Sequence, residues 1–222
     1  MKSIFRNTAE SILNSDARIV FLFICILSAA IVVFQKYFIL TDEVYYNSLG
    51  EQMAYDRIES FLDNQRKMAW IGYALIPVIV FLQIFLVSIC LNIGTLVNNS
   101  QVSFRKIFSM VTKTLAIPTF LKVVSLLIFY SFYSVRTFDD LANVFTFSLL
   151  DLFGVKNVPL LLKFPLASIN IIELMFWILL AFGVKHLLKT NFSRSLSFVS
   201  YTYGVGFVIW ILFVLFLQVN LT

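Results

Sequence analysis

Five long runs of apolar residues, separated by shorter polar segments, dominate the pattern of this chain. A helix of about 20 apolar residues is long enough to cross the hydrocarbon layer of a membrane. The pattern therefore predicts an all-α fold: a polytopic integral membrane helical bundle with five transmembrane helices and short interfacial helices. The expected spans are residues 19–40, 69–97, 116–133, 166–188 and 200–221, which together form one membrane domain, 19–221.

The polar segments predict the parts outside the membrane. Residues 1–18 form an N-terminal segment, either a short amphipathic turn on the membrane surface or a frayed tail. The apolar run after it is too long for a signal peptide and lacks a small-residue cleavage site, so we expect an uncleaved first span. Two longer loops, 41–68 and 134–165, should lie on the other side of the membrane.

Apolar residues recur at helical spacing within both loops. We expect a small helix over residues 51–66, outside the membrane, and one of about 15 residues around 139–152, lying on the outer face. The second span is longer than the hydrocarbon layer requires, which predicts a tilt or a kink near Pro77.

Residues 101–115 also repeat apolar side chains at helical spacing, and Arg105, Lys106 and Lys113 lie off that stripe. One interpretation is an interfacial basic helix that contacts lipid headgroups or a partner, separated from the third span by Pro118. The other is that these residues are simply the cytoplasmic start of the third span. The sequence leaves both open.

Composition supports the membrane class, since 60% of the 222 residues are hydrophobic and 13% are charged. The net charge is +5, but the basic residues are spread between the spans and form no patch, so nucleic acid is not an expected partner. Cys25 and Cys90 both fall inside apolar spans without metal-ligand spacing and are expected to be reduced packing thiols.

The distribution of charge predicts the orientation. Segments 1–18, 98–114 and 185–199 carry nine basic and two acidic residues, whereas the two loops on the other side carry six basic and nine acidic residues. Basic residues on short loops mark the cytoplasmic side. We therefore expect a cytoplasmic N-terminus and an extracytoplasmic C-terminus, in a bacterial inner membrane.

Glu173 is the one acidic residue inside a predicted span, and it shares a helix face with Asn170 and Trp177. A charged residue at the centre of a span costs about 2.5–3.5 kcal/mol on insertion scales, so a partner at matching depth is expected. Lys36 matches that depth better than Lys122, which predicts an interspan contact between Lys36 and Glu173. The functional alternative is a proton or ion path through Glu173.

Motifs for catalysis are absent from the sequence. It contains no His-Glu-x-x-His, no Gly-x-Ser-x-Gly, no phosphate-binding glycine loop and no pair of carboxylates within one span. His186, the single histidine, has no acid or nucleophile beside it in sequence and is interpreted as a helix-end residue. The expectation is a protein that is not an enzyme and uses no metal and no cofactor.

Two segments carry a recognisable pattern of residue types. One is the basic lead-in with a proline, Phe104 to Leu127, and the other is the polar-then-aromatic start and glycine-basic exit of Ile169 to Phe198. These segments resemble the Yip (Ypt-interacting protein) domain family in its prokaryotic form. The five-span plan with a cytoplasmic N-terminus is also similar. The resemblance implies a small polytopic protein without catalysis, and it implies no particular binding residue.

Two functions are consistent with these features. The first is a non-catalytic accessory or scaffold protein that contacts lipid and binds another integral membrane protein in a complex. The second is a permease-like subunit of a transporter, with Glu173 in the path. Transporters often show repeated halves, and this chain has an odd number of spans and no visible repeat, so the sequence favours the accessory role.

Overall fold

The computed structural model describes residues 16–50, 53–100, 102–141, 148–154 and 157–221. Nearly all of the expected N-terminal segment 1–18 lies outside these ranges. The described residues form helices and no strand, with one isolated β-bridge between Ser148 and Asn170. Five helical stretches are long and apolar enough to cross a membrane: Ala17–Ile39, Tyr55–Val97, Phe104–Phe132, Ile171–Leu188 and Phe192–Asn220. The predicted all-α bundle is confirmed.

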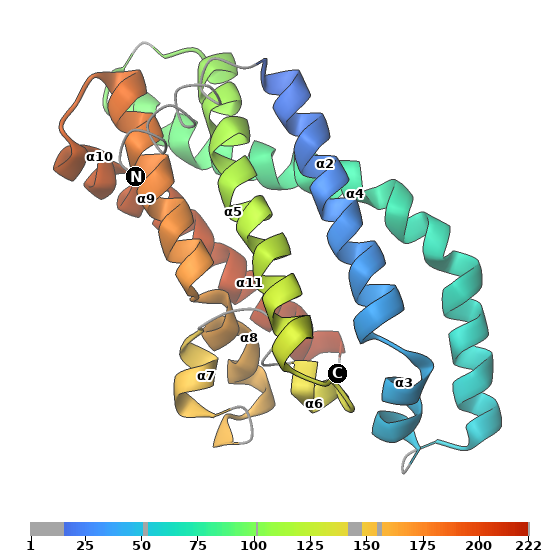
Figure 1. The fold of residues 1–222 in the computed structure, drawn as a ribbon. Coiled ribbons are helices and arrows are strands. Elements are labelled where there is room, and N and C mark those ends of the chain that lie inside the picture. The colour runs from blue at the N-terminus through green and yellow to red at the C-terminus, as the bar shows by residue number, and fades with distance from the viewer. Residues whose placement is uncertain (1–15, 51–52, 101, 142–147, 155–156, 222) are drawn as a thin grey trace.

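The helix α5 (Phe104–Phe132) lies at the centre of the bundle (Figure 1). It packs against α2 (Ala17–Phe34), α4 (Tyr55–Val97) and α9 (Ile171–Leu188). Aliphatic side chains from these helices form a continuous core, in which the most deeply buried members are Ile24, Ile84, Leu91, Val111 and Leu180. The chain therefore buries one face of each helix against α5 and leaves the remaining apolar faces outward.

The helix that contains the second span begins earlier than the sequence predicted. A small outer helix was expected over 51–66 and a separate span over 69–97, but from Tyr55 onward these residues form one 43-residue helix, α4. The segment between Leu62 and Ala69 is polar but contains neither glycine nor proline, so nothing in it ends a helix. Figure 1 shows α4 bent along its length, and Pro77, which lies inside it, removes one backbone hydrogen bond.

The third span shows the same continuity. The basic segment 101–115 is not a separate interfacial helix, because α5 runs unbroken from Phe104 through Pro118 to Phe132. Ser103 precedes the helix in an extended conformation. The hydroxyls of Thr114 and Thr119, on either side of Pro118, bond to carbonyls one turn earlier. Of the two interpretations, the structure selects the one in which Arg105, Lys106 and Lys113 belong to the start of the span.

The loop 134–165 is broken into short pieces. Residues 142–147 of the expected helix of about 15 residues lie outside the described ranges. The described parts of the loop form α6 (Phe138–Leu141), α7 (Leu149–Phe153) and the start of α8 (Leu160–Ser168). Ser148 is extended and caps α7, and its backbone N–H and hydroxyl both donate to Asp151 Oδ2. A serine that competes for backbone bonds in this way interrupts a helix.

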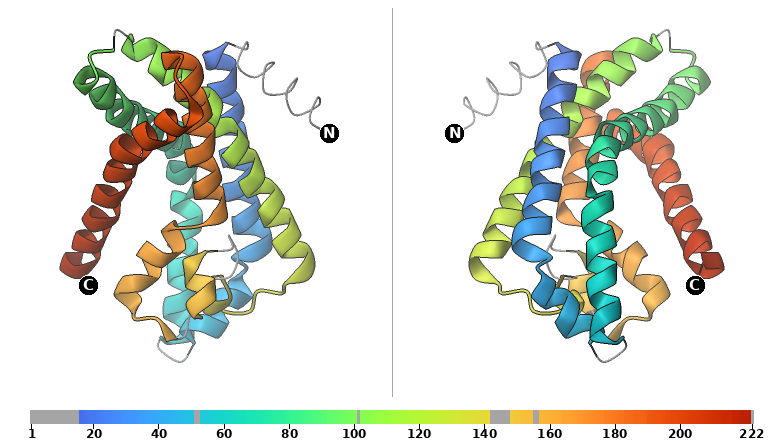
Figure 2. Two further views of the ribbon diagram at one scale, coloured as in Figure 1. Left: turned by 90° about the vertical axis from the view of Figure 1, so that its left-hand side faces the viewer. Right: turned by 90° about the vertical axis from the view of Figure 1, so that its right-hand side faces the viewer.

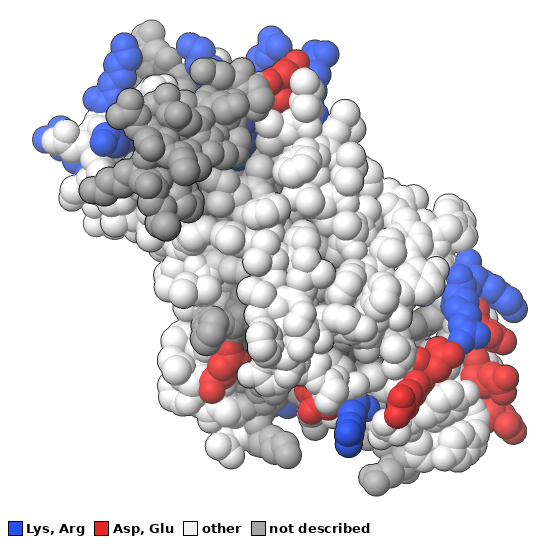
Figure 3. All heavy atoms as spheres, viewed as in Figure 1, with Lys and Arg blue, Asp and Glu red and all other residues white. Residues whose placement is uncertain are grey.

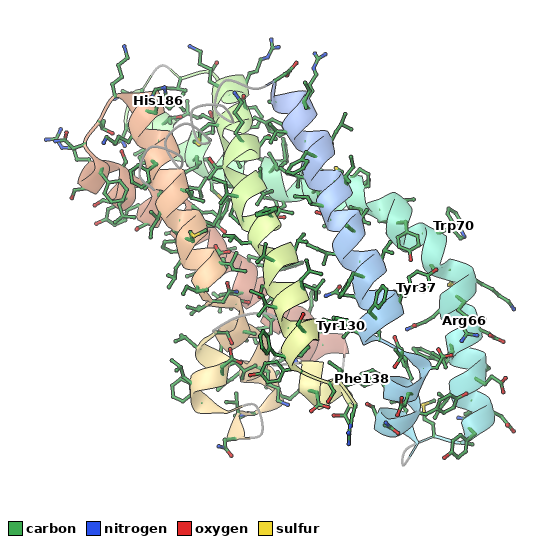
Figure 4. All side chains as sticks on the ribbon, viewed as in Figure 1. Tyr37, Arg66, Trp70, Tyr130, Phe138 and His186 are labelled. Carbon is green, nitrogen blue, oxygen red and sulfur yellow. The ribbon has the colours of Figure 1, made fainter. Side chains whose placement is uncertain are left out.

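The helix α3 (Asp42–Leu49) closes the same end of the molecule. Arg66 Nη2 of α4 lies 2.6 Å from Asp42 Oδ2, and the Ser48 hydroxyl accepts a hydrogen bond from the backbone N–H of Phe138. Val44 of α3 and Ile58 of α4 are fully buried between them. Figure 4 shows Arg66 and Phe138 at this end of the bundle. The helix α3 therefore links the first part of α4 to the loop that contains Phe138.

Charged side chains gather at the two ends of the bundle and leave an apolar belt between them (Figure 3). We name the end with the starts of α2 and α5 and the end of α9 the basic end. Its described basic residues are Arg18, Arg105, Lys106, Lys113, Lys185, Lys189 and Arg194. The opposite end, with α3 and α7, carries both signs of charge. This separation is the arrangement expected of a bundle whose middle lies in hydrocarbon.

The last span departs from the rest of the bundle. It comprises α10 (Phe192–Val199), the π-helix η3 (Ser200–Gly204) and α11 (Val205–Leu221). The turn before it is made at Lys189, which ends α9 in the left-handed conformation with φ 52°. Figure 2 shows α11 leaning away from the other spans.

Candidate functional site

Glu173, the acid predicted within the fourth span, lies at the start of a helix. The expected span 166–188 is divided, because α8 ends at Ser168 and α9 begins only at Ile171. Asn170 is the N-cap of α9, and its side-chain oxygen accepts a hydrogen bond from the backbone N–H of Glu173 at 2.9 Å. Glu173 is thus in the first turn of α9, where the helix dipole favours a negative charge.

One oxygen of the Glu173 carboxylate accepts two hydrogen bonds. Trp177 donates from Nε1 to Glu173 Oε1 at 2.9 Å, and Tyr203 donates from Oη to the same oxygen at 2.6 Å. Trp177 is one turn further along α9, whereas Tyr203 belongs to η3 in the last span. We name these three residues the Glu173 cluster; it ties α9 to the last span through a half-buried polar contact.

The π-helix η3 and a small residue position the Tyr203 ring. The ring lies edge-on to Phe176, with centroids 5.5 Å apart, and to Trp177, at 5.7 Å. Gly204 follows it, and a Cβ at that position would lie 2.9 Å from the Trp177 ring. Glycine therefore allows the indole to reach η3. Single turns of π-helix occur often at functional positions, and here the turn aims one hydroxyl at a carboxylate.

The structure does not bring Lys36 to Glu173. The ammonium group of Lys36, in the π-helix η1 (Gln35–Ile39), lies 5.9 Å from the centre of the Tyr73 ring, a cation–π contact with α4. Helix α5 lies between α2 and α9 and contacts both. The expected Lys36–Glu173 contact is therefore not formed, because a third helix separates the two residues.

Lys122 of α5 matches the depth of Glu173 better than the sequence indicated. The sequence placed Lys122 too near the basic end because the span was expected to begin at residue 116. Since α5 begins at Phe104, Lys122 lies in its second half, on the side where α9 starts. The sequence singled out Glu173 and placed Asn170 on the same helix face, but it did not predict that Asn170 caps α9.

The sequence reasoning also missed Tyr203, which was grouped with Tyr201 as an aromatic residue at a span boundary. Trp177 could be found, because it is four residues from Glu173 on one helix face. Tyr203 is 30 residues away and on another helix. A signal was available only in the pair Tyr203-Gly204, a polar aromatic beside a small residue, and that pair does not specify its partner.

Other polar groups inside the spans are satisfied within their own helices. The hydroxyls of Ser88, Thr112 and Thr114 each bond to the carbonyl four residues earlier. In the described residues, no buried side-chain nitrogen or oxygen atom is left without a hydrogen-bond partner. Nor do the described residues contain a group of three His, Cys, Asp or Glu side chains that could hold a metal ion. The Glu173 cluster can therefore join α9 to the last span.

The remaining predicted site residues lie at the basic end. Arg105 and Lys106 are in the first turn of α5, and Lys113 is two turns further along. They line a cavity together with His186, which is in the last turn of α9.

These features define the class of protein: a polytopic α-helical integral membrane protein in which a polar contact joins two spans. No family model, no curated protein and no solved structure matches the chain. The resemblance to the Yip domain family rests on the sequence segments alone.

Proposed function

We propose that the protein is a non-catalytic accessory subunit of a membrane complex, oriented with the basic end in the cytoplasm of a bacterial cell. Its partner is another integral membrane protein. The resemblance to the Yip domain family belongs to the same proposal, because that family is similar in its five spans and in having no known catalysis. The positive-inside distribution of charge supports the orientation.

The observation that carries the proposal is the position of α11. Among the described elements, α11 packs extensively only against η3, which precedes it, and against α8 at the opposite end. Large apolar side chains are exposed along its length: Val205, Val208, Ile209, Trp210, Leu212, Phe213, Phe216, Leu217 and Val219. A span that leans away from its own bundle presents these side chains to a neighbouring span, and packing between spans drives such association.

The polar groups favour this role over a permease-like one. A path for a polar substrate needs side chains that are free to bind it at the depth of the membrane. Glu173 already accepts two hydrogen bonds, and the buried hydroxyls of Ser88, Thr112 and Thr119 bond to their own helices. No chain of unpaired polar groups crosses the described bundle.

Site-specific photo-crosslinking in native membranes tests the proposal. We expect a benzoylphenylalanine in place of Phe216 of α11 to give one discrete adduct with another membrane protein. The same group in place of Leu22 of α2 is a matched control, because the two side chains are almost equally exposed, at 63% and 61%. Leu22 should give no such adduct.

Equal adduct patterns at the two positions would contradict a docking role for α11. Flux of a solute through the purified chain in vesicles, abolished by Glu173→Ala, would contradict the proposal in favour of transport. The adduct should form at unit stoichiometry with one partner, since an accessory subunit occupies a defined place in its complex.

A further inference from the structure

A cavity at the basic end lies between the start of α5 and the end of α9. Its volume is about 470 Å³, within the usual range for small-ligand sites. Figure 4 shows His186 at this end of α9. Six polar side chains line the cavity: Ser103, Arg105, Lys106, Ser109, Lys113 and His186. We name it the basic cavity.

The residues that line the cavity are basic or neutral. Arg105, Lys106 and Lys113 contribute three positive charges, and none of the residues that line the cavity is acidic. Clustered basic side chains with no acid among them create a local positive potential. The start of a 29-residue helix adds to this potential, because the backbone N–H groups of its first turn carry partial positive charge.

Several side chains that line the cavity have hydrogen-bond donors without a partner. Among the described residues, the side chains of Arg105, Lys106 and His186 have no hydrogen-bond or ion-pair partner. The hydroxyl of Ser103, the N-cap of α5, bonds to no backbone group of the helix. Lys113 lines the cavity but already has an interaction of its own. Donors from α5 and α9 are thus available to one acceptor-rich group.

The floor of the cavity is apolar and closely packed. Gly183 of α9 and Met110 of α5 form part of it, and a Cβ at Gly183 would overlap the Met110 side chain. Leu187 completes the apolar part of the lining. A site with donors at its rim and hydrocarbon beneath them, at the end of membrane-spanning helices, fits a ligand with both an anionic and an apolar part.

We propose that the basic cavity binds a phosphate group, supplied by the headgroup of an anionic membrane lipid. Phosphate oxygens match the donors: an arginine fork, a lysine ammonium, a hydroxyl and an imidazole can each donate to them. The position at the membrane boundary favours a lipid over a soluble phosphate compound. The site is independent of α11 and of the Glu173 cluster.

Native mass spectrometry of the full chain tests this. Delipidated protein in a mild detergent is titrated with phosphatidylglycerol or with phosphatidylcholine, which differ in net charge. We expect selective retention of phosphatidylglycerol, weakened about 30-fold by the double change Arg105→Gln and Lys106→Gln, as expected for two basic side chains near an anionic group. The control is Lys185→Gln with Lys189→Gln, which removes the same charge from the basic end outside the cavity.

Equal losses in the two double variants would overturn the proposal, because binding would then follow overall charge. Displacement of the lipid by millimolar inorganic phosphate would keep the phosphate chemistry and assign a soluble ligand instead. If the Arg105 and Lys106 variant does not fold, Ser109→Asp introduces a negative charge into the same cavity. It should also reduce retention of phosphatidylglycerol, and unchanged retention would overturn the proposal.

Discussion

At the residue scale, Glu173 shows what the sequence can locate and what it cannot. A lone acid in an apolar run requires partners, and the i to i+4 spacing of Trp177 follows from helical geometry. The cap by Asn170 is equally local. Tyr203 comes from the last span, and only the packing of α9 against that span brings its hydroxyl to the carboxylate. Local pairs were predictable from the sequence, and the long-range partner was not.

The change Tyr203→Phe measures the contribution of that partner. It removes the hydroxyl and leaves the ring in its edge-on contacts with Phe176 and Trp177. We expect the free energy of unfolding to fall by about 1.5–3 kcal/mol, the range for a hydrogen bond to a charged group. Equilibrium unfolding in detergent gives this value, with Tyr201→Phe as control because Tyr201 is 78% exposed. Similar values for the two variants would show that the contact adds nothing.

At the element scale, the apolar pattern identified the five spans and most of their last residues, but it misplaced the first residues of the second to the fifth span. The stretch Asp63 to Met68 is polar, so it was expected outside the second span, but its residues are compatible with a helix and α4 continues through them. In one of the two interpretations left open by the sequence, Pro118 separated two helices, but it lies inside α5. Hydropathy reports where lipid is, whereas helix ends depend on residues that break or cap the backbone. The two coincide at Val97 and Leu188, where α4 and α9 end at the residues expected from hydropathy.

Glycines test how closely the helices pack. A Cβ at Gly183 of α9 would overlap Met110 of α5, whereas a Cβ at Gly72 of α4 would meet nothing within 4 Å. We expect Gly183→Ala to lower the free energy of unfolding by about 1–3 kcal/mol through overpacking. Gly72→Ala should raise it by about 0.5–1 kcal/mol, because alanine favours a helix.

Unfolding of both variants in the same detergent checks the two signs. A Met110→Ala background provides the control, since it removes the side chain that the new methyl group meets. In that background the penalty of Gly183→Ala should disappear. If Gly183→Ala still lowers the free energy of unfolding without the Met110 side chain, the loss does not come from overpacking against Met110.

At the scale of the whole molecule, the two ends of the bundle differ in charge: one end is mainly basic and the other carries both signs (Figure 3). The sequence predicted this sorting, because the basic residues cluster in the short segments between spans. The tilt of α11 was not predictable, since its apolar residues surround the helix and specify no preferred neighbour.

Labelling of single cysteines tests the orientation. In a background with Cys25→Ala and Cys90→Ala, we introduce Ser193→Cys at the basic end or Asn157→Cys at the opposite end; both positions are exposed. A membrane-impermeant maleimide should label position 157 in intact cells and position 193 only after permeabilisation. The reverse result would place the basic end outside the cytoplasm and contradict the proposed orientation.

Lys189 places a positive charge at a position where the backbone conformation is unfavourable for a residue with a side chain. It ends α9 with φ 52°, a conformation that costs a residue with a side chain roughly 1–2 kcal/mol and costs glycine little. Glycine would make the same turn with less strain and would carry no ammonium group. The chain thus gives up some folding free energy at this corner and keeps a positive charge at the basic end.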